Sequence, residues 1–572
     1  MTETLISPGV SAKETDTSFI TKGPVVVGAA IVGPTAKGPV NVPTVVTTYS
    51  EFESVFGRTV TSGSNNFTFF TSISAQNYFQ QGGNSLLVTR VAEGDYSPAI
   101  SSVSSITGGT PVFEIQTISE GAVMNSSGSE TSSGILENGT KENIRWEISY
   151  SDTGSGTFNL LIRRGDDNTK NKIILEQWRG LDLDPDSENY IERVIGNTIN
   201  IYNEDPTTGE SYITPMGTYT NKSAYVVVKN VQSIPNYFLA DGTPDPNYSG
   251  LLPKVSSGSF SEGSGSMFDG MTANFYEKIN GLNTQGLIVS QSSVPAYDEA
   301  LSLLNSKEDY SFNVITTPGL TMGQHGNTLQ KVINIADGRQ DCIAVIDLVG
   351  FGSTINTVVE KAKSMDTSYA ATYWPWVQTS DGGKAVWVPA STMIPGVYAF
   401  TDASSEPWFA PAGMLRGGLG RVIQPERKIT SGHRDTLYTN NVNPIAYLPQ
   451  NGIAVFGQKT TQKRSSALGR INVRRLLIEV KGYISQISNS LVFEPNTQAV
   501  RNNFLSRVNP YLETIQQRNG LYAFKVVMDD SNNDAASIDR NELRGQIFLQ
   551  PTKTIEYILL DFSITPTGVS FE

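Results

Sequence analysis

The chain has 572 residues, of which 38% are hydrophobic and 17% are charged, and its formal net charge is −13. This length exceeds what one hydrophobic core usually organises, so we expect roughly three or four folding units. Cys342 is the single cysteine, which excludes an intrachain disulfide and any multi-cysteine metal or redox site. The start, Met-Thr-Glu-Thr, has no secretory-signal pattern and no run approaches transmembrane length, so we expect folding in a reducing cytoplasm without stable membrane insertion.

The first part of the chain predicts an extended arm followed by an α/β pattern. Residues 1–20 are polar apart from a few apolar side chains, too few to bury a face of their own. Residues 24–29 and 86–91 are apolar runs typical of buried strands, and residues 67–81 have helical periodicity. The order strand, helix, strand favours a parallel sheet covered on both faces.

The same pattern returns far downstream and predicts one discontinuous α/β core domain over residues 21–94 and 270–450. Further buried strands are predicted at 287–290, 312–315 and 343–348. Helices are predicted between them at 296–304, 328–336 and 354–365. Cys342 precedes one of these strands, where a packed structural thiol is favoured over a reactive one.

Residues 95–269 differ in character and predict an inserted β-rich domain. Clusters of Gly, Ser, Thr and Asn separate short strand-like runs at 144–149, 158–163 and 224–229. Chains tolerate such insertions where the two ends of a surface loop already lie close together.

Residues 451–572 predict a mixed α+β C-terminal domain that ends in an extended arm. An apolar stripe follows one side of a helix over 471–491, and a second helix is predicted over 497–518 with an interruption at Asn509-Pro510. Strands are predicted at 522–528 and 546–549. The last strand, 555–565, alternates apolar residues at Ile558, Leu560, Phe562 and Ile564.

Positive charge is concentrated in this C-terminal region. Residues 451–520 carry ten Lys and Arg against three acidic residues, a net charge of +7, so the other 502 residues carry −20. Segregated charge of this kind favours an acidic partner, although a solvated helix face remains the simpler interpretation. Nucleic acid is the less favoured partner, because the remaining negative charge would repel phosphates.

No motif predicts a catalytic, cofactor-binding or metal-binding site. Residues 33–39 lack the Lys and Ser or Thr of a phosphate-binding loop, and the acidic loops at 182–188 and 530–534 lack the Gly and Glu of a calcium loop. His325 and His433 are the only histidines and stand outside any hydrolase or metalloprotease motif. We therefore predict a protein that is not an enzyme and needs no cofactor.

Several short stretches occur together in one order along the chain. They are Leu5-Ile6-Ser7-Pro8-Gly9-Val10, Gly338-Arg339-Gln340-Asp341-Cys342, Trp408-Phe409-Ala410-Pro411-Ala412-Gly413, Arg470-Ile471-Asn472-Val473-Arg474-Arg475-Leu476, Phe493-Glu494-Pro495-Asn496 and Ile538-Asp539-Arg540-Asn541-Glu542. In this order they resemble the tail sheath protein of contractile-tailed bacteriophages. The resemblance covers about 1–94 and 270–572, while the insertion resembles the family only around Ile162-Arg163-Arg164.

The resemblance implies a structural subunit that polymerises helically around a tail tube. The sheath contracts when the baseplate triggers it and drives the tube through the host envelope, with the energy stored in a metastable extended assembly. The implied partners are the chain itself, the tail tube protein, and the baseplate and tail terminator proteins. The implied location is the virion tail, after assembly in the host cytoplasm.

The resemblance also assigns roles to the regions described above. The C-terminal domain would face the tube, the insertion would lie outward, and the two arms would add strands to sheets of neighbouring subunits. The tube-facing basic surface would consist of Lys459, Lys463, Arg464, Arg470, Arg474, Arg475 and Lys481. The inter-subunit arms would use Leu5, Ile6, Val10, Ile558, Leu560, Phe562 and Ile564.

Three alternatives stay open from the sequence. A sheath of another contractile injection system, such as a bacteriocin or a secretion apparatus, would differ in context more than in chemistry. An α/β enzyme with a decorating β domain would turn over a substrate as a monomer. A nucleic-acid-binding protein would bind DNA with a steep salt dependence.

Overall fold

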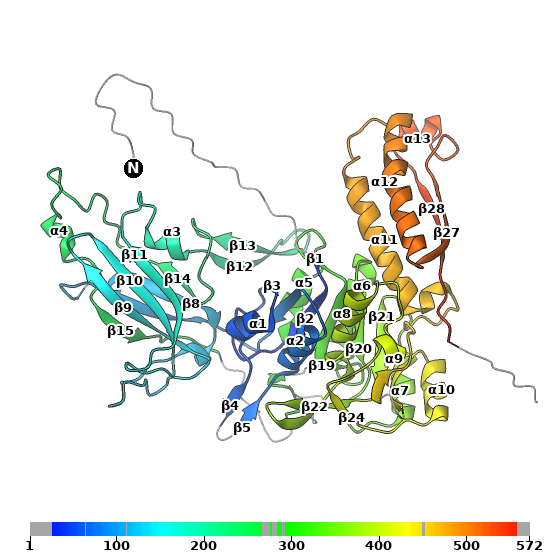
Figure 1. Cartoon of the computed structure of the whole chain (residues 1–572), viewed down its shortest axis with the longest axis horizontal. Coiled ribbons are helices and arrows are strands. Elements are labelled where there is room, and N and C mark those ends of the chain that lie inside the picture. Colours follow the sequence, from blue (N-terminus) through cyan, green and yellow to red (C-terminus); the bar gives the residue numbers. More distant parts are fainter. Residues whose placement is uncertain are drawn as a thin grey trace, which may run out of the picture.

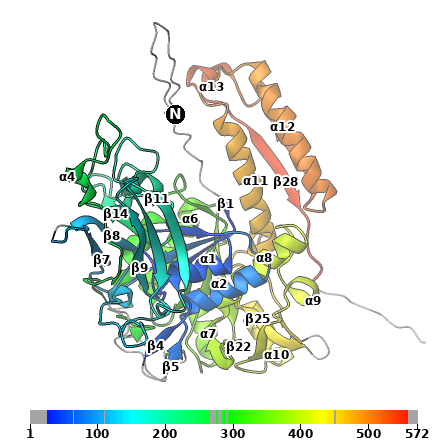
Figure 2. The same ribbon diagram turned by 60° about the vertical axis from the view of Figure 1, so that its left-hand side comes forward.

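The computed structural model describes residues 26–62, 65–109, 111–265, 275–276, 283–288, 290, 292–448 and 452–556. The arm predicted over 1–20 lies outside these residues, as do all the apolar positions predicted for the two arms. Figures 1 and 2 show a mixed α/β molecule with a central α/β part, a β-rich part on one side and a pair of long helices standing out on the other.

The centre is an eight-stranded sheet in the order β26-β25-β21-β20-β19-β2-β6-β3. The strands from β6 to β25 run parallel, and β3 and β26 pair antiparallel at the two edges. The strand bounds are β2 Ala29–Gly33, β3 Thr44–Val46, β6 Leu86–Arg90, β19 Val314–Thr321, β20 Ile343–Asp347, β21 Ala370–Trp374, β25 Asn443–Leu448 and β26 Gly452–Val455. β2 pairs with β19, so the two stretches separated by the insertion share one sheet.

Continuous apolar strands form this sheet because helices cover both of its faces. Every residue of β2, β6, β20 and β21 is buried. One face packs on α5 Asp298–Leu303, α6 Gly326–Arg339 and α7 Ile355–Ala362. The other packs on α1 Tyr49–Phe56, α2 Phe70–Gln80 and α8 Ile394–Ser404. Cys342 is buried at the start of β20, which confirms a packed thiol, and burial raises the pKa of that thiol.

Two features of the predicted core differ from the structure. The strand predicted at 287–290 is β17 Leu287–Ile288, which pairs antiparallel with β16 Asn283–Thr284 and not with the central sheet. Gln285 and Gly286, both with positive φ, form the two-residue turn that closes this hairpin. The central sheet also takes its edge strand β26 from residues that were predicted to belong to the C-terminal domain.

The insertion contains two antiparallel sheets that enclose their own apolar core. One sheet is β14-β8-β7, with bounds β7 Pro98–Ser104, β8 Pro111–Glu120 and β14 Val226–Lys229. The other is β11-β10-β9-β15, with bounds β9 Ile144–Asp152, β10 Thr157–Arg164, β11 Ile174–Leu181 and β15 Ser256–Ser259. A separate hairpin, β12 Ile199–Glu204 with β13 Ser211–Met216, follows the short helix α3 Ile191–Ile195.

Buried polar contacts attach the insertion to the core. The Lys37 ammonium lies 3.6 Å from a carboxylate oxygen of Glu142 and donates to its backbone carbonyl at 3.2 Å. Burial lowers the pKa of Lys37 and raises the pKa of Glu142, and their mutual attraction opposes both shifts. Arg90 donates to the carbonyls of Gly38 and Glu120 at 2.5 and 2.9 Å. These contacts bond buried groups of both parts to one another, so the junction is a packed one.

The C-terminal region is two helices with a β-ribbon laid along them (Figure 1). The elements are α11 Ile471–Asn489, α12 Gln498–Gln517, β27 Leu521–Val527, α13 Ala535–Asp539 and β28 Gln546–Pro551. α12 runs through Pro510 without a break, so the predicted interruption is wrong. Phe504 and Val508 before the proline, and Leu512 and Ile515 after it, are buried in one apolar cluster, and this packing holds the helix together.

Candidate functional site

The ribbon of β27 and β28 has open edges. Within the described residues each of these strands pairs only with the other. The inner face packs on the helices through Phe524 and Val526 of β27 and Ile547 and Leu549 of β28. On the outer face, Phe548 is 56% exposed. Such edges present unpaired backbone N–H and C=O groups, and these can accept a strand from another segment or another chain.

Arg470 and Gln458 form a clamp that holds the last described residues beside the start of α11. Both carboxylate oxygens of Glu556 accept hydrogen bonds from the Arg470 guanidinium, at 2.6 and 2.8 Å. The side-chain amide of Gln458 donates to Thr554 and, at 3.5 Å, to Glu556. A bidentate arginine–carboxylate pair has a fixed geometry, so these contacts fix the position of the last described residues.

Arg474 and Arg475 do not belong to an exposed basic surface, contrary to the prediction. Each is 4% exposed. Arg475 donates to both oxygens of Asp402 at 2.5 and 2.6 Å, and the Arg474 guanidinium lies 3.9 Å from the Tyr369 ring centroid and bonds Ser368. Arginines on a helix that packs against a sheet can be buried in this way when the sheet side supplies polar and aromatic partners.

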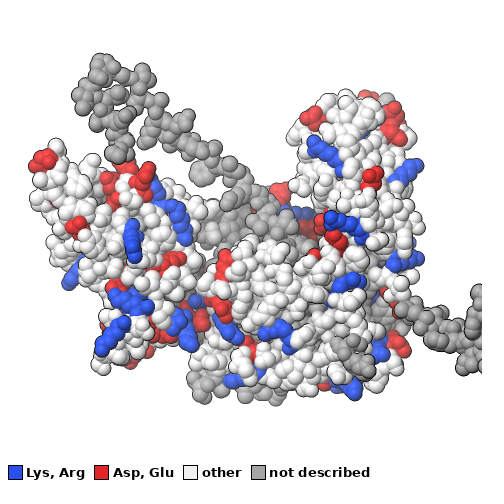
Figure 3. Space-filling view, in the orientation of Figure 1, with Lys and Arg blue, Asp and Glu red and all other residues white. Residues whose placement is uncertain are grey.

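The other predicted basic residues differ in exposure. Lys459 is half-buried and donates a hydrogen bond to the Tyr438 carbonyl at 2.8 Å. Burial lowers the pKa of Lys459, and repulsion from Arg470 adds to that shift. Lys463, Arg464 and Lys481 are exposed. Lys463 and Lys481 both contact the segment 366–369. The Lys463 backbone donates to Asp366 at 2.8 Å, and the Lys481 ammonium lies 3.5 Å from the Tyr369 hydroxyl. Figure 3 shows basic and acidic side chains interspersed over the part of the molecule that α11 and α12 form in Figure 1, on the face in view.

The carboxyl ends of the parallel strands are where an α/β enzyme would bind a ligand. Asp347, at the end of β20, is buried and accepts hydrogen bonds from the backbone and hydroxyl of Ser391. Burial raises the pKa of Asp347 to about 7, although these hydrogen bonds oppose the shift. His325 is fully buried and accepts a hydrogen bond from the Thr321 backbone at 2.9 Å. Both side chains are enclosed in the packed core, and neither is presented to a substrate.

Metal-ligand clusters and membrane-spanning helices are absent from the described part of the chain. No group of three or more His, Cys, Asp or Glu side chains there could hold a metal ion. None of the helices described combines the length and the hydrophobicity needed to cross a bilayer.

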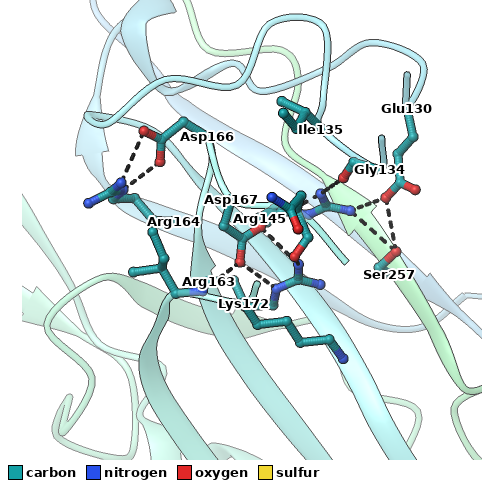
Figure 4. A network of polar contacts seen from close by, with 12 residues as sticks. Glu130, Gly134, Ile135, Arg145, Arg163, Arg164, Asp166, Asp167, Lys172 and Ser257 are labelled. Atoms are coloured by element: carbon teal, nitrogen blue, oxygen red, sulfur yellow. Dashed lines mark hydrogen bonds and ion pairs between the residues drawn. The ribbon is translucent and has the colours of Figure 1, made fainter. Parts of the chain in front are cut away.

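The motif Ile162-Arg163-Arg164 belongs to a charge network inside the insertion (Figure 4). Arg163 is 1% exposed and donates to both oxygens of Asp167, each at 2.8 Å, and to Glu147 at 2.7 Å. Arg145, from the neighbouring strand β9, lies 3.8 Å from Asp167 and pairs with Glu130. The network ties β9 and β10 to each other, to the segment before β9 through Glu130 and to the loop after β10 through Asp167, so the role of the motif is to hold this sheet together.

A groove lies beside the clamp and was not predicted. It has a volume of about 740 Å³ and is lined by aromatic side chains from segments that are far apart in sequence: Trp408, Phe409, Tyr438, Phe456 and Tyr522. The first two belong to one of the stretches that carry the family resemblance, which was the only available signal. The other three join them through the tertiary structure alone.

The sequence also matches known proteins over much of its length. Residues 291–461 match the phage tail sheath protein central domain, and residues 463–565 match the phage tail sheath C-terminal domain. The tail sheath protein of Vibrio phage KVP40 is 32% identical over 43% of this chain and 40% of its own length. That of Enterobacteria phage T4 is 30% identical over 55% of this chain and 51% of its own length. The chain thus spans about half, or less, of the curated relatives that it matches.

A solved structure extends the likeness to most of the chain. The crystal structure of a sheath tail protein from Listeria innocua aligns with 92% of this chain and 96% of that chain, with a TM-score of 0.51 and 10% sequence identity. At this level of identity the likeness concerns the fold alone.

Proposed function

The chain belongs to the phage tail sheath family, and we propose that it is the structural subunit of a contractile phage tail sheath. It polymerises helically around a tail tube and contracts when a baseplate triggers it, which drives the tube through the host envelope. The observation that carries this proposal is the open-edged ribbon of β27 and β28, which lies in the part matched to the sheath C-terminal domain. The curated relatives reported above are phage proteins, which favours a virion tail over a bacteriocin or secretion apparatus.

The ribbon provides the means of polymerisation. Residues 1–20 and 557–572 of neighbouring subunits add strands to its two edges through main-chain hydrogen bonds. Their apolar side chains give each added strand a face to bury, and the exposed Phe548 on the outer face of β28 extends the apolar area that an added strand contacts. A strand exchanged between copies is a head-to-tail contact, which produces a helical polymer when it does not close into a ring.

Contraction uses energy stored during assembly. The extended sheath is a trapped state, held by contacts to the tube, and its release lets the subunits rotate and repack while the exchanged strands keep them linked. The baseplate and a tail terminator protein are the partners at the two ends of the sheath. The assembled location is the virion, after synthesis and assembly in the host cytoplasm.

Self-assembly is the direct test of this function. The purified full-length chain, imaged by negative-stain electron microscopy at high concentration, should form rings or hollow tubes, because the ribbon edges and the arms are both present in one chain. Adding purified tail tube should produce sleeves around the tube. A chain that stays monomeric both alone and with tube would contradict the proposal.

Tube docking depends on the exposed basic residues near the start of α11. Replacing Lys463 and Arg464 with Glu should weaken binding to the tube about tenfold or more at low salt, since these charges attract an acidic surface. The difference from wild type should shrink as salt rises and screens the charges. Cosedimentation with tubes over a salt series measures both effects.

The matched control is Lys170→Glu with Arg179→Glu, which makes the same charge change on exposed residues of the insertion. This control should leave tube binding close to wild type. Equal losses from the two double variants would show that only net charge matters and that Lys463 and Arg464 do not face the tube.

A further inference from the structure

The aromatic groove beside the clamp is shaped and lined as a binding site. It lies between the end of β26, the helices α9 Gly413–Arg416 and α10 Ser431–Thr439, and the start of the C-terminal region. Phe456 on one wall is 45% exposed and Tyr522 on another is 57% exposed. Large apolar side chains that gather around one hollow typically mark a surface that another group covers.

Two buried acceptors in the groove walls lack hydrogen-bond donors. Gln458 and Asn472 line the groove and are 4% and 3% exposed. The Oε1 atom of the first and the Oδ1 atom of the second accept no hydrogen bond from the described residues. Buried acceptors are nearly always paired, and a segment whose backbone carries N–H groups is one kind of partner that can donate to both.

Two arginines of the groove lie over its aromatic rings, and the lining also includes Lys553 and the carboxylates of Asp435 and Glu556. Arg416 lies 4.9 Å from the Phe409 ring centroid and Arg434 lies 5.6 Å from that of Phe456. Neither arginine forms an ion pair with a described acidic residue, while Glu556, which also lines the groove, is already paired with Arg470. Aromatic rings combined with available guanidinium groups suit an apolar segment that carries an acidic residue.

We propose that in the unassembled subunit this groove holds residues 557–572 of the same chain. Residues 552–556 already form part of the groove wall, so the chain reaches the groove at its last described residue, and Ile555 there is 82% exposed. The sequence continues as Tyr-Ile-Leu-Leu-Asp-Phe, an apolar run that places Asp561 between Leu560 and Phe562. A segment tethered directly at the site has a high effective concentration there, which favours its own groove over another copy.

When residues 557–572 occupy the groove of their own chain, they regulate polymerisation. This consequence rests on the proposed function, in which the same segment is exchanged between subunits of the sheath. A segment that occupies its own groove is not available to a neighbour, so each exchange must first displace it. Free subunits at low concentration are thereby kept from polymerising, and a high subunit concentration, a template or a growing end shifts the balance toward exchange.

Cross-linking of the full-length chain tests the proposal. The variant Phe456→Cys with Phe562→Cys places one thiol in the groove and one in the segment, while the native Cys342 is buried. Monomer from a mixture of ¹⁴N-labelled and ¹⁵N-labelled protein is treated with a short bismaleimide, and the linked peptides are identified by mass spectrometry. We expect links within one isotope, at a yield about tenfold above the control.

The control is Phe548→Cys with Phe562→Cys, because Phe548 has a similar exposure but lies on the ribbon outside the groove. Adding Arg434→Glu to the test variant should lower its yield severalfold. Links that mix the isotopes would show that a second copy fills the groove, and a yield equal to the control would show that residues 557–572 do not; either result overturns the proposal. Electron microscopy of the parent chain reports polymerisation separately, so failure of the sheath function and failure of the groove assignment are distinguishable.

Discussion

Replacing Asp167 with Ala should destabilise the insertion by about 3–5 kcal/mol, because it removes the fully buried, bidentate partner of Arg163 and leaves Glu147 as its remaining counter-charge. Asp167 is fully buried and accepts two hydrogen bonds from Arg163, which is itself buried. It also lies 3.8 Å from the buried guanidinium of Arg145, so one substitution weakens the pairing of two buried arginines (Figure 4). Urea unfolding followed by tryptophan fluorescence, to which Trp146 of β9 and Trp178 of β11 contribute from the insertion, measures the loss.

The neighbouring residue supplies the control. Asp166 pairs with Arg164 at the surface, where the two side chains are 24% and 32% exposed, so Asp166→Ala should cost less than about 1 kcal/mol. Removing both charges with Arg163→Met and Asp167→Leu should recover part of the stability lost in the single variant, because well-packed apolar pairs can replace buried ion pairs. Equal losses from Asp166→Ala and Asp167→Ala would contradict the role assigned to the network.

Replacing Leu5, Ile6 and Val10 with Ser should abolish polymerisation and leave a folded monomer. Burial of each apolar side chain in a neighbour's ribbon stabilises the contact by about 1.5–3 kcal/mol, and a helical polymer repeats that contact at every subunit. The described fold begins at β1 Val26–Val27 and is built without these residues, so the free energy of unfolding of the monomer should be unchanged. Electron microscopy and chemical denaturation provide the two measurements.

A polar substitution set in the same arm is the matched control. Thr2, Thr4 and Thr15 replaced with Ser change the arm without removing its main apolar side chains, and polymers should form at normal yield. Normal polymers from the Leu5, Ile6 and Val10 variant would show that the arm is not needed for the contact between subunits.

Elements with a strong local pattern were predictable from sequence. The helices α2 and α11 and the strands β6 and β20 occur where periodicity and apolar runs predicted them, because burial of one helix side or of both strand faces leaves a direct mark on local sequence. The partner of each strand leaves no such mark. The β17 hairpin was therefore assigned to the central sheet, and the packing that keeps α12 continuous through Pro510 was missed.

The chain by itself determined the family resemblance, the mixed α/β character and the excess of positive charge in the C-terminal region. Only the tertiary structure decided which of those charges are exposed. Arg475 meets Asp402 across 73 residues and Arg474 meets Ser368 across 106, so their burial depends on partners that no local pattern can identify. The groove likewise exists only because distant aromatic residues converge, since the fold brings surfaces together by packing free energy and not by proximity along the chain.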